Sequence, residues 1–162
     1  SVLPVECLNG LRKLCDENNI LLIFDEVQCG FLRSGKMFAY QWSDIKPDIL
    51  TPAKAIANGF PLGATMTTKK VGEVMNHGTH GSTYGGNPLA VAVGNAVLDL
   101  MQKKDFLENL EKVSSYLFLG LQDISNKYPD SISEIRGKGL ILGLKCVKDN
   151  ITFVKELSLI HI

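Results

Sequence analysis

The sequence has no net charge, no long apolar run and no closely paired cysteines. Lys and Arg together number 17, and so do Asp and Glu, so the formal net charge at pH 7 is zero. Balanced charge removes the usual electrostatic basis for binding nucleic acid or an acidic membrane surface. The longest wholly apolar run in the first half is Ile20 to Phe24, and a membrane-spanning helix needs about 20 such residues. We therefore expect neither a nucleic-acid partner nor a membrane span.

The cysteines give no sign of a metal site or of disulfide bonds. The chain has four of them, none in the close pairs typical of a zinc site: Cys7, Cys15, Cys29 and Cys146. No N-terminal segment combines a basic start, an apolar stretch and a small-residue cleavage site. We therefore expect reduced, packed thiols, no bound metal and a cytoplasmic location.

The residues that are present suffice for a packed core. The chain has 162 residues, 45% of them hydrophobic, which excludes a disordered chain. A domain of about 150 residues buries about two-thirds of its unfolded surface. Apolar periodicity predicts helices at 4–18, 37–42, 88–102 and 105–128, strands at 20–24, 48–51, 63–68, 132–136 and 140–146, and the start of a helix at 151–162. The apolar strand at 20–24 is typical of a parallel sheet covered on both faces.

Two charged residues follow neighbouring strands of this predicted sheet. Asp25 comes directly after the strand at 20–24, and Lys54 lies just past the strand at 48–51. If the two strands are parallel neighbours, both residues lie at the carboxyl edge, where open α/β sheets bind ligands. Desolvation there would lower the pKa of the lysine and make its amine nucleophilic. A plain salt bridge between the two side chains is the alternative.

A glycine-rich loop offers a place for phosphate. Residues 74–98 contain no charged side chain, and their first half carries Ser82 and Thr83 among glycines. Backbone amides and hydroxyls in such a loop suit a phosphate group. With Gln28 and the two charged residues, this set of groups points to pyridoxal phosphate. A lysine-dependent lyase without a cofactor is a weaker alternative, because it leaves the loop no phosphate to hold.

Four motifs in order resemble one enzyme family. They are LLIFDEVQCG (21–30), RSG (33–35), PDILTPAKAIANGFPLGA (47–64) and GTHGSTYGGNPLA (78–90). Together they resemble the class III (ornithine-type) aminotransferases, which are fold-type I pyridoxal-phosphate enzymes. The resemblance implies an α/β fold, with part of a cofactor-binding large domain (a mostly parallel sheet flanked by helices) at 1–103. It also implies the start of an incomplete, small α+β domain at 104–162.

The resemblance also implies roles for individual residues. Lys54 matches the catalytic lysine that bonds covalently to the cofactor. The other matches are Asp25 at the pyridine nitrogen, Val27 on the ring face, Gln28 near the phenolic oxygen, and Ser82 and Thr83 at the phosphate across a dimer interface. We therefore expect a homodimer.

The resemblance extends to the substrates. Thr79 and His80, followed by Gly81 to Tyr84, are most similar to the members that move the terminal amino group of N-acetylornithine to 2-oxoglutarate in arginine biosynthesis. Ornithine, succinylornithine or 4-aminobutyrate is the alternative amino donor, and a non-catalytic fragment is the other alternative. Upstream family segments that bind phosphate and substrate have no counterpart here, so we expect the 162-residue chain alone to have little turnover.

Four further residues have structural interpretations. Arg33 and Arg136 resemble structural positions of the family. Leu32 stands where many relatives carry glycine, so we expect a different local turn. Glu26 is either a supporting group behind the site or a solvated carboxylate.

Overall fold

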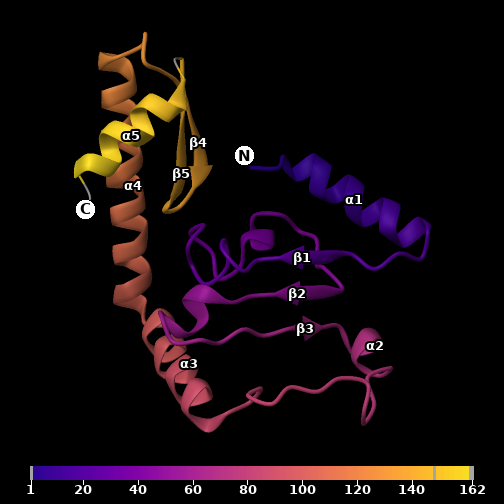
Figure 1. The fold of residues 1–162 in the computed structure, drawn as a ribbon. Coiled ribbons are helices and arrows are strands. Elements are labelled where there is room, and N and C mark those ends of the chain that lie inside the picture. Colours follow the sequence, from indigo (N-terminus) through magenta and orange to yellow (C-terminus); the bar gives the residue numbers. More distant parts are fainter. Residues whose placement is uncertain (1, 148, 161–162) are drawn as a thin grey trace.

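The computed structural model describes residues 2–147 and 149–160 (Figure 1). The first part contains α1 (Val5–Glu17), β1 (Ile23–Asp25), the 3-10 helix η1 (Ala39–Trp42), β2 (Ile49–Thr51), the 3-10 helix η2 (Lys54–Ala57), β3 (Met66–Thr67) and α2 (Lys69–Gly72). The second part contains α3 (Pro88–Met101), α4 (Lys104–Lys127), β4 (Ile132–Lys138), β5 (Ile141–Cys146) and α5 (Asn150–Ile160). Within these ranges, no helix combines the length and apolarity that crossing a membrane requires.

The three short strands of the first part form one sheet in the order β1-β2-β3. β1 and β2 are parallel, with Asp25 opposite Thr51, as the sequence predicts. β3 runs antiparallel to β2, so this three-stranded sheet has one parallel and one antiparallel pairing. The parallel pair brings the carboxyl ends of β1 and β2 to one edge, which is the arrangement that a ligand site needs.

The second part has its own sheet, an antiparallel hairpin of β4 and β5. The hairpin confirms the two strands expected around the Gly137–Gly139 turn. Its tip lies against the loop after β1, because the Leu140 N–H donates to the Arg33 carbonyl at 3.0 Å. Gly139, at φ +60°, has no room for a side chain, since a Cβ there would lie 2.4 Å from the Ser34 carbonyl carbon.

The helices begin and end near the positions that the sequence predicts. α1 ends before Asn18, and Asn19 takes a left-handed conformation at φ 52°. Asn87 caps α3, because its side chain accepts the Ala90 N–H at 2.9 Å. α4 is one unbroken helix in spite of Gly120, whose intrinsic cost relative to alanine is about 1 kcal/mol.

An ion pair joins α1 to the amino ends of the strands. Arg12 donates to the Asp48 carboxylate at 2.8 Å, and the Leu22 N–H donates to the same oxygen at 2.8 Å. The Leu22 N–H, and after it the Arg12 guanidinium, hold the pKa of Asp48 below its ordinary value. This pair therefore fixes α1 at the edge of the sheet opposite to the carboxyl ends.

The buried core is small and lies around β1, β2 and the start of α3. Its apolar members are Leu22, Phe31, Leu32, Leu50, Ala57 and Ala90. The expectation that the strand at 20–24 is covered on both faces is wrong for the described structure, because Ile23 is 56% exposed. α1, the helix that precedes β1, has no buried residue either.

Candidate active site

β1 ends at Asp25, which places this residue at the carboxyl edge of the sheet, and a turn follows directly. One Asp25 carboxylate oxygen accepts the Val27 N–H at 2.9 Å, which orients the side chain. The backbone N–H of Glu26 donates to the Thr51 carbonyl at 3.0 Å, so the pairing with β2 continues past the strand. The turn closes when the Gly30 N–H donates to the Glu26 carbonyl at 3.0 Å.

Lys54 begins η2, directly after β2. Its backbone is left-handed, with φ 46°, a conformation that costs a side-chain-bearing residue about 1–2 kcal/mol. Strain of this kind persists only where the surroundings enforce it, and it clusters at functional sites. The conformation is an observation that sequence motifs alone did not provide, and Lys54 shares it with Asn19, Phe31, Leu32 and Asn58.

The narrow face of α3 supports η2. Ala90 is fully buried, and a Cβ added at Gly94 would lie 2.8 Å from a Leu62 methyl and 3.6 Å from the Ile56 carbonyl. Small residues at these positions let α3 approach the segment that follows Lys54.

Asp25 and Lys54 follow parallel strands at the same edge. Asp25 pairs with Thr51, three residues before Lys54, and both side chains are exposed. Within the described ranges no ion pair joins the two side chains, so the simple salt-bridge interpretation does not hold. A free amine and an oriented carboxylate at one edge fit the donor groups that pyridoxal phosphate requires.

The structure assembles only part of the predicted residue set. Half-buried Val27 and exposed Gln28 share the turn that carries Asp25. Ser82 and Thr83 are exposed on the loop between α2 and α3, which Figure 1 shows passing beyond β3, away from β1. Ser82 is engaged locally, because its hydroxyl accepts the Gly85 N–H at 3.0 Å.

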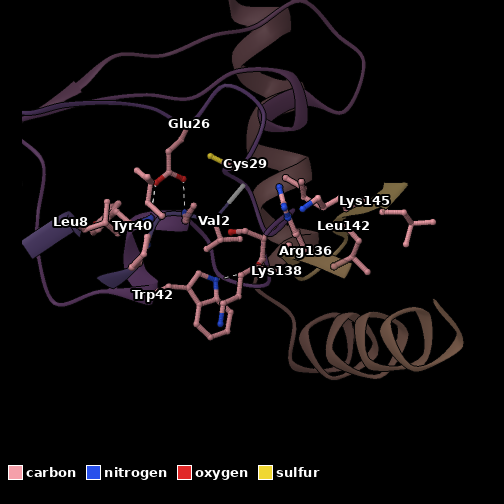
Figure 2. A pocket seen from close by; sticks show the side chains of 18 of the residues that line it. Val2, Leu8, Glu26, Cys29, Tyr40, Trp42, Arg136, Lys138, Leu142 and Lys145 are labelled. Carbon is pink, nitrogen blue, oxygen red and sulfur yellow. Dashed lines mark hydrogen bonds between the residues drawn. The ribbon is translucent and has the colours of Figure 1, made fainter. Parts of the chain in front are cut away.

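Glu26 is a residue whose importance the sequence left open. Glu26 is only 2% exposed, so the interpretation of its side chain as a solvated carboxylate is wrong. The carboxylate accepts the backbone N–H groups of Ala39 at 2.5 Å and Tyr40 at 2.8 Å (Figure 2). Burial raises the pKa of Glu26, and the two N–H bonds oppose this rise only in part.

A cleft of about 1260 Å³ opens beside this turn (Figure 2). Its walls are the residues at the start of the chain, the carboxyl end of β1 and the β4–β5 hairpin. Asp25 lines the cleft, together with Glu26 and Cys29, whereas Lys54 and Gln28 are not among its lining residues. Burial, and then the negative charge of Glu26, raise the pKa of the Cys29 thiol.

The loop from 31 to 35 forms the junction with the hairpin. Phe31 and Leu32 are buried, with φ values of 51° and 68°. Leu32 therefore adopts the left-handed conformation that favours glycine. Trp42 closes this junction, since its ring N–H donates to the Ser34 carbonyl at 2.9 Å and Lys138 lies 4.5 Å from its ring centroid. Arg136 pairs with Glu134 on its own strand at 2.7 Å.

The described part of the chain shows neither disulfides nor a metal cluster. All four cysteines are free thiols. Within the described ranges, no group of three or more His, Cys, Asp or Glu side chains is placed to hold a metal ion.

Comparison with known proteins identifies the family. The model of the family described as aminotransferase class-III matches residues 1–159. The chain belongs to the class III aminotransferases. The acetylornithine aminotransferase of Brucella melitensis is 48% identical over 159 residues, which are 98% of this chain and 40% of that protein. This chain thus spans about 40% of the length of that relative.

Solved structures place the fold in the same family. The N-acetylornithine aminotransferase of Stenotrophomonas maltophilia matches with a TM-score of 0.75 and 38% identity, over 88% of this chain and 36% of that chain. The taurine:2-oxoglutarate aminotransferase of Bifidobacterium kashiwanohense, solved with PLP and glutamate, matches with a TM-score of 0.81 and 36% identity, over 90% of this chain and 33% of that chain. The expected family and fold class are confirmed, and with them the pyridoxal-phosphate cofactor of class III aminotransferases.

Proposed function

We propose that the protein to which this chain belongs moves the terminal amino group of N-acetylornithine to 2-oxoglutarate, using pyridoxal phosphate, in arginine biosynthesis. The observation that carries the proposal is the shared edge, where Asp25 and the strained Lys54 follow paired parallel strands. The choice of substrate rests on the relatives named acetylornithine aminotransferase, which include one 54% identical over 140 residues.

Each residue of the edge has a chemical task in this proposal. When bound, pyridoxal phosphate supplies an electron sink for the substrate carbon that loses a proton. The Asp25 carboxylate keeps a proton on the ring nitrogen, because a nearby negative charge favours the cationic form. The Lys54 amine would hold the cofactor covalently and, when free, would take the proton from the substrate carbon as a general base. Val27 would lie on the ring face, and Gln28 would lie near the phenolic oxygen.

The exposed loop between α2 and α3 has a task in a homodimer. Ser82 and Thr83 are exposed on this loop, which passes beyond β3 on the side away from β1 (Figure 1). We assign them to the cofactor phosphate of a second copy, with Thr83 as the main contact. The uncharged surface of this segment, where Val74 is 70% and Tyr84 81% exposed, supports burial against a partner.

The two sheets support a division of the chain into two domains. We assign residues 1–103 to the cofactor-binding large domain, which holds the β1–β3 sheet. Residues 104–162 open the small C-terminal domain, which holds the β4–β5 hairpin. The four free thiols are consistent with a reducing cytoplasm.

Amino transfer from a panel of donors tests the proposed substrate. The protein translated from its whole reading frame is incubated with 2-oxoglutarate and with one amino donor at a time. The donors are N-acetylornithine, ornithine, succinylornithine and 4-aminobutyrate. We expect the highest kcat/KM with N-acetylornithine. A clear preference for another donor would replace the proposed substrate by that donor, and we expect the 162-residue chain alone to give little turnover.

A further inference from the structure

We propose that Glu26 is a positioning residue, whose buried carboxylate holds the turn bearing Asp25 and Gln28 in place at the carboxyl edge of the sheet. The task of the turn, which is to present Asp25 and Gln28 to the cofactor, is taken from the proposed function. The way in which the turn is held is inferred from the contacts of Glu26.

Glu26 anchors the turn at three points. Its backbone N–H donates to the Thr51 carbonyl of β2, and its carbonyl accepts the Gly30 N–H, both at 3.0 Å. Its carboxylate binds two consecutive backbone N–H groups at the start of η1, from Ala39 and Tyr40. Glu26 thus ties together the strand that leads to Lys54, the turn itself and η1.

The carboxylate is held by backbone N–H groups and is almost closed to solvent. The residue is 2% exposed, and each carboxylate oxygen accepts one of the two N–H groups (Figure 2). The packing is close as well, because a Cβ at Gly30 would lie 2.9 Å from the Glu26 carbonyl and 3.4 Å from a carboxylate oxygen. Glu26 therefore acts through its neighbours and does not touch the reacting groups.

The contacts of Glu26 depend on both the length and the charge of its side chain. The two N–H donors need two acceptor oxygens, and glutamine offers one oxygen and an NH2 group that opposes the second donor. Aspartate keeps both oxygens on a side chain that is one methylene shorter. Glu26→Gln thus removes an acceptor at constant size, and Glu26→Asp shortens the reach at constant charge.

Amide hydrogen exchange, followed by NMR, tests the positioning role without any cofactor. In Glu26→Gln we expect the amides of Ala39 and Tyr40 to exchange about tenfold faster, because one of these two N–H groups loses its acceptor. We expect the amides of Val27 and Gly30 to exchange faster as well, because the turn loses its tie to η1. Amides of the β4–β5 hairpin should not change, and neither should any amide of this turn in the matched control Glu108→Gln on α4. Unchanged exchange at Val27 and Gly30 would overturn the proposal. If Glu26→Gln does not fold, the same comparison in Glu26→Asp decides.

Binding of pyridoxal phosphate then links this role to the site. Wild-type chain and variants are titrated with pyridoxal phosphate, reduced with borohydride and analysed for labelled Lys54. We expect Glu26→Gln to need about tenfold more pyridoxal phosphate for half-maximal labelling, with the same labelling at saturation. Asp48→Asn weakens the fold at the amino ends of the strands. We expect it to need the same pyridoxal phosphate concentration for half-maximal labelling as the wild type.

The two proposals fail in different ways. An equal loss of affinity in Asp48→Asn and Glu26→Gln would assign Glu26 to general folding and overturn its positioning role. If the protein translated from its whole reading frame is not labelled at Lys54 in the same assay, the proposed function is contradicted, and the exchange measurement still decides the role of Glu26.

Discussion

Asp48 shows at the scale of one residue how a carboxylate fastens a helix to a sheet. It accepts the Leu22 N–H and the Arg12 guanidinium on one oxygen. Asp48→Asn keeps an acceptor for the N–H but loses the ionic contact, so we expect the free energy of unfolding to fall by about 1–2 kcal/mol. Urea unfolding at pH 7 measures this loss. The control Glu17→Gln, in an exposed pair with Lys13, should change stability by less than about 0.5 kcal/mol.

The same residue predicts a pH dependence with a definite sign. Because the pKa of Asp48 is lowered in the fold, its stabilisation is fully present above the ordinary aspartate value of about 3.9 and is lost as the pH falls through the lowered value. The stability difference between wild type and Asp48→Asn should therefore shrink below about pH 4. Glu26 acts in the opposite sense, since its raised pKa makes its contribution less favourable as the pH rises. A difference that stays constant down to pH 2 would contradict the assignment to Asp48.

Lys54 provides a second test at this scale. Its left-handed φ of 46° is strained for any residue with a Cβ, whereas glycine adopts it freely. We therefore expect Lys54→Gly to be about 1 kcal/mol more stable to urea than Lys54→Ala. In an ordinary helix the order is reversed. If Lys54→Ala is the more stable variant, the strained conformation is absent in solution.

Residues differ in how far the sequence predicts them. The order of strands and charged residues predicts that Asp25 and Lys54 share an edge, and the strand register agrees. The burial of Glu26 could not be predicted, because its partners are backbone N–H groups 13 and 14 residues away. Leu32 combines a positive φ with a buried side chain, and the different local turn expected there stays a prediction.

At the scale of elements, α3 positions the segment that begins with Lys54. Gly94 faces Leu62 and Ile56 with no room for a side chain. We expect Gly94→Val to displace η2, to lower stability by about 1–3 kcal/mol and to weaken the labelling of Lys54 by pyridoxal phosphate. Gly120→Val on α4 is the matched control, because nothing lies within 4 Å of its added Cβ. Equal effects of both substitutions would show that close packing of α3 on η2 is unimportant.

Helices and hairpins are the elements that the sequence predicts best. The cap at Asn87 and the apolar spacing of α4 depend on neighbouring residues only. The sheet is harder, because β1 includes only Ile23 and Phe24 of the apolar run at 20–24. The direction of β3 depends on the path of the chain through the loop before it, which no local pattern records.

At the scale of the molecule, much apolar surface is uncovered. Ile20, Ile23 and Leu119 are each more than half exposed, and the chain spans about 40% of the length of its relative from Brucella melitensis. The apolar residues of a strand predict that the strand is buried. They do not predict which other part of the protein packs on it. This is why the both-faces-buried expectation for β1 fails here, although the family and the fold are confirmed.

The central claim is that Lys54 and Asp25 form one cofactor site. The most direct measurement is to reduce the complex with pyridoxal phosphate by borohydride and to map the modified peptide by mass spectrometry in wild type and Asp25→Asn. We predict a phosphopyridoxyl group on Lys54 in the wild type, with labelling weakened by about tenfold or more in Asp25→Asn, since one charge-assisted contact is worth about 1.5–3 kcal/mol. A label on other lysines with Lys54 unmodified, or labelling of Lys54 that is indifferent to Asp25, would contradict the account.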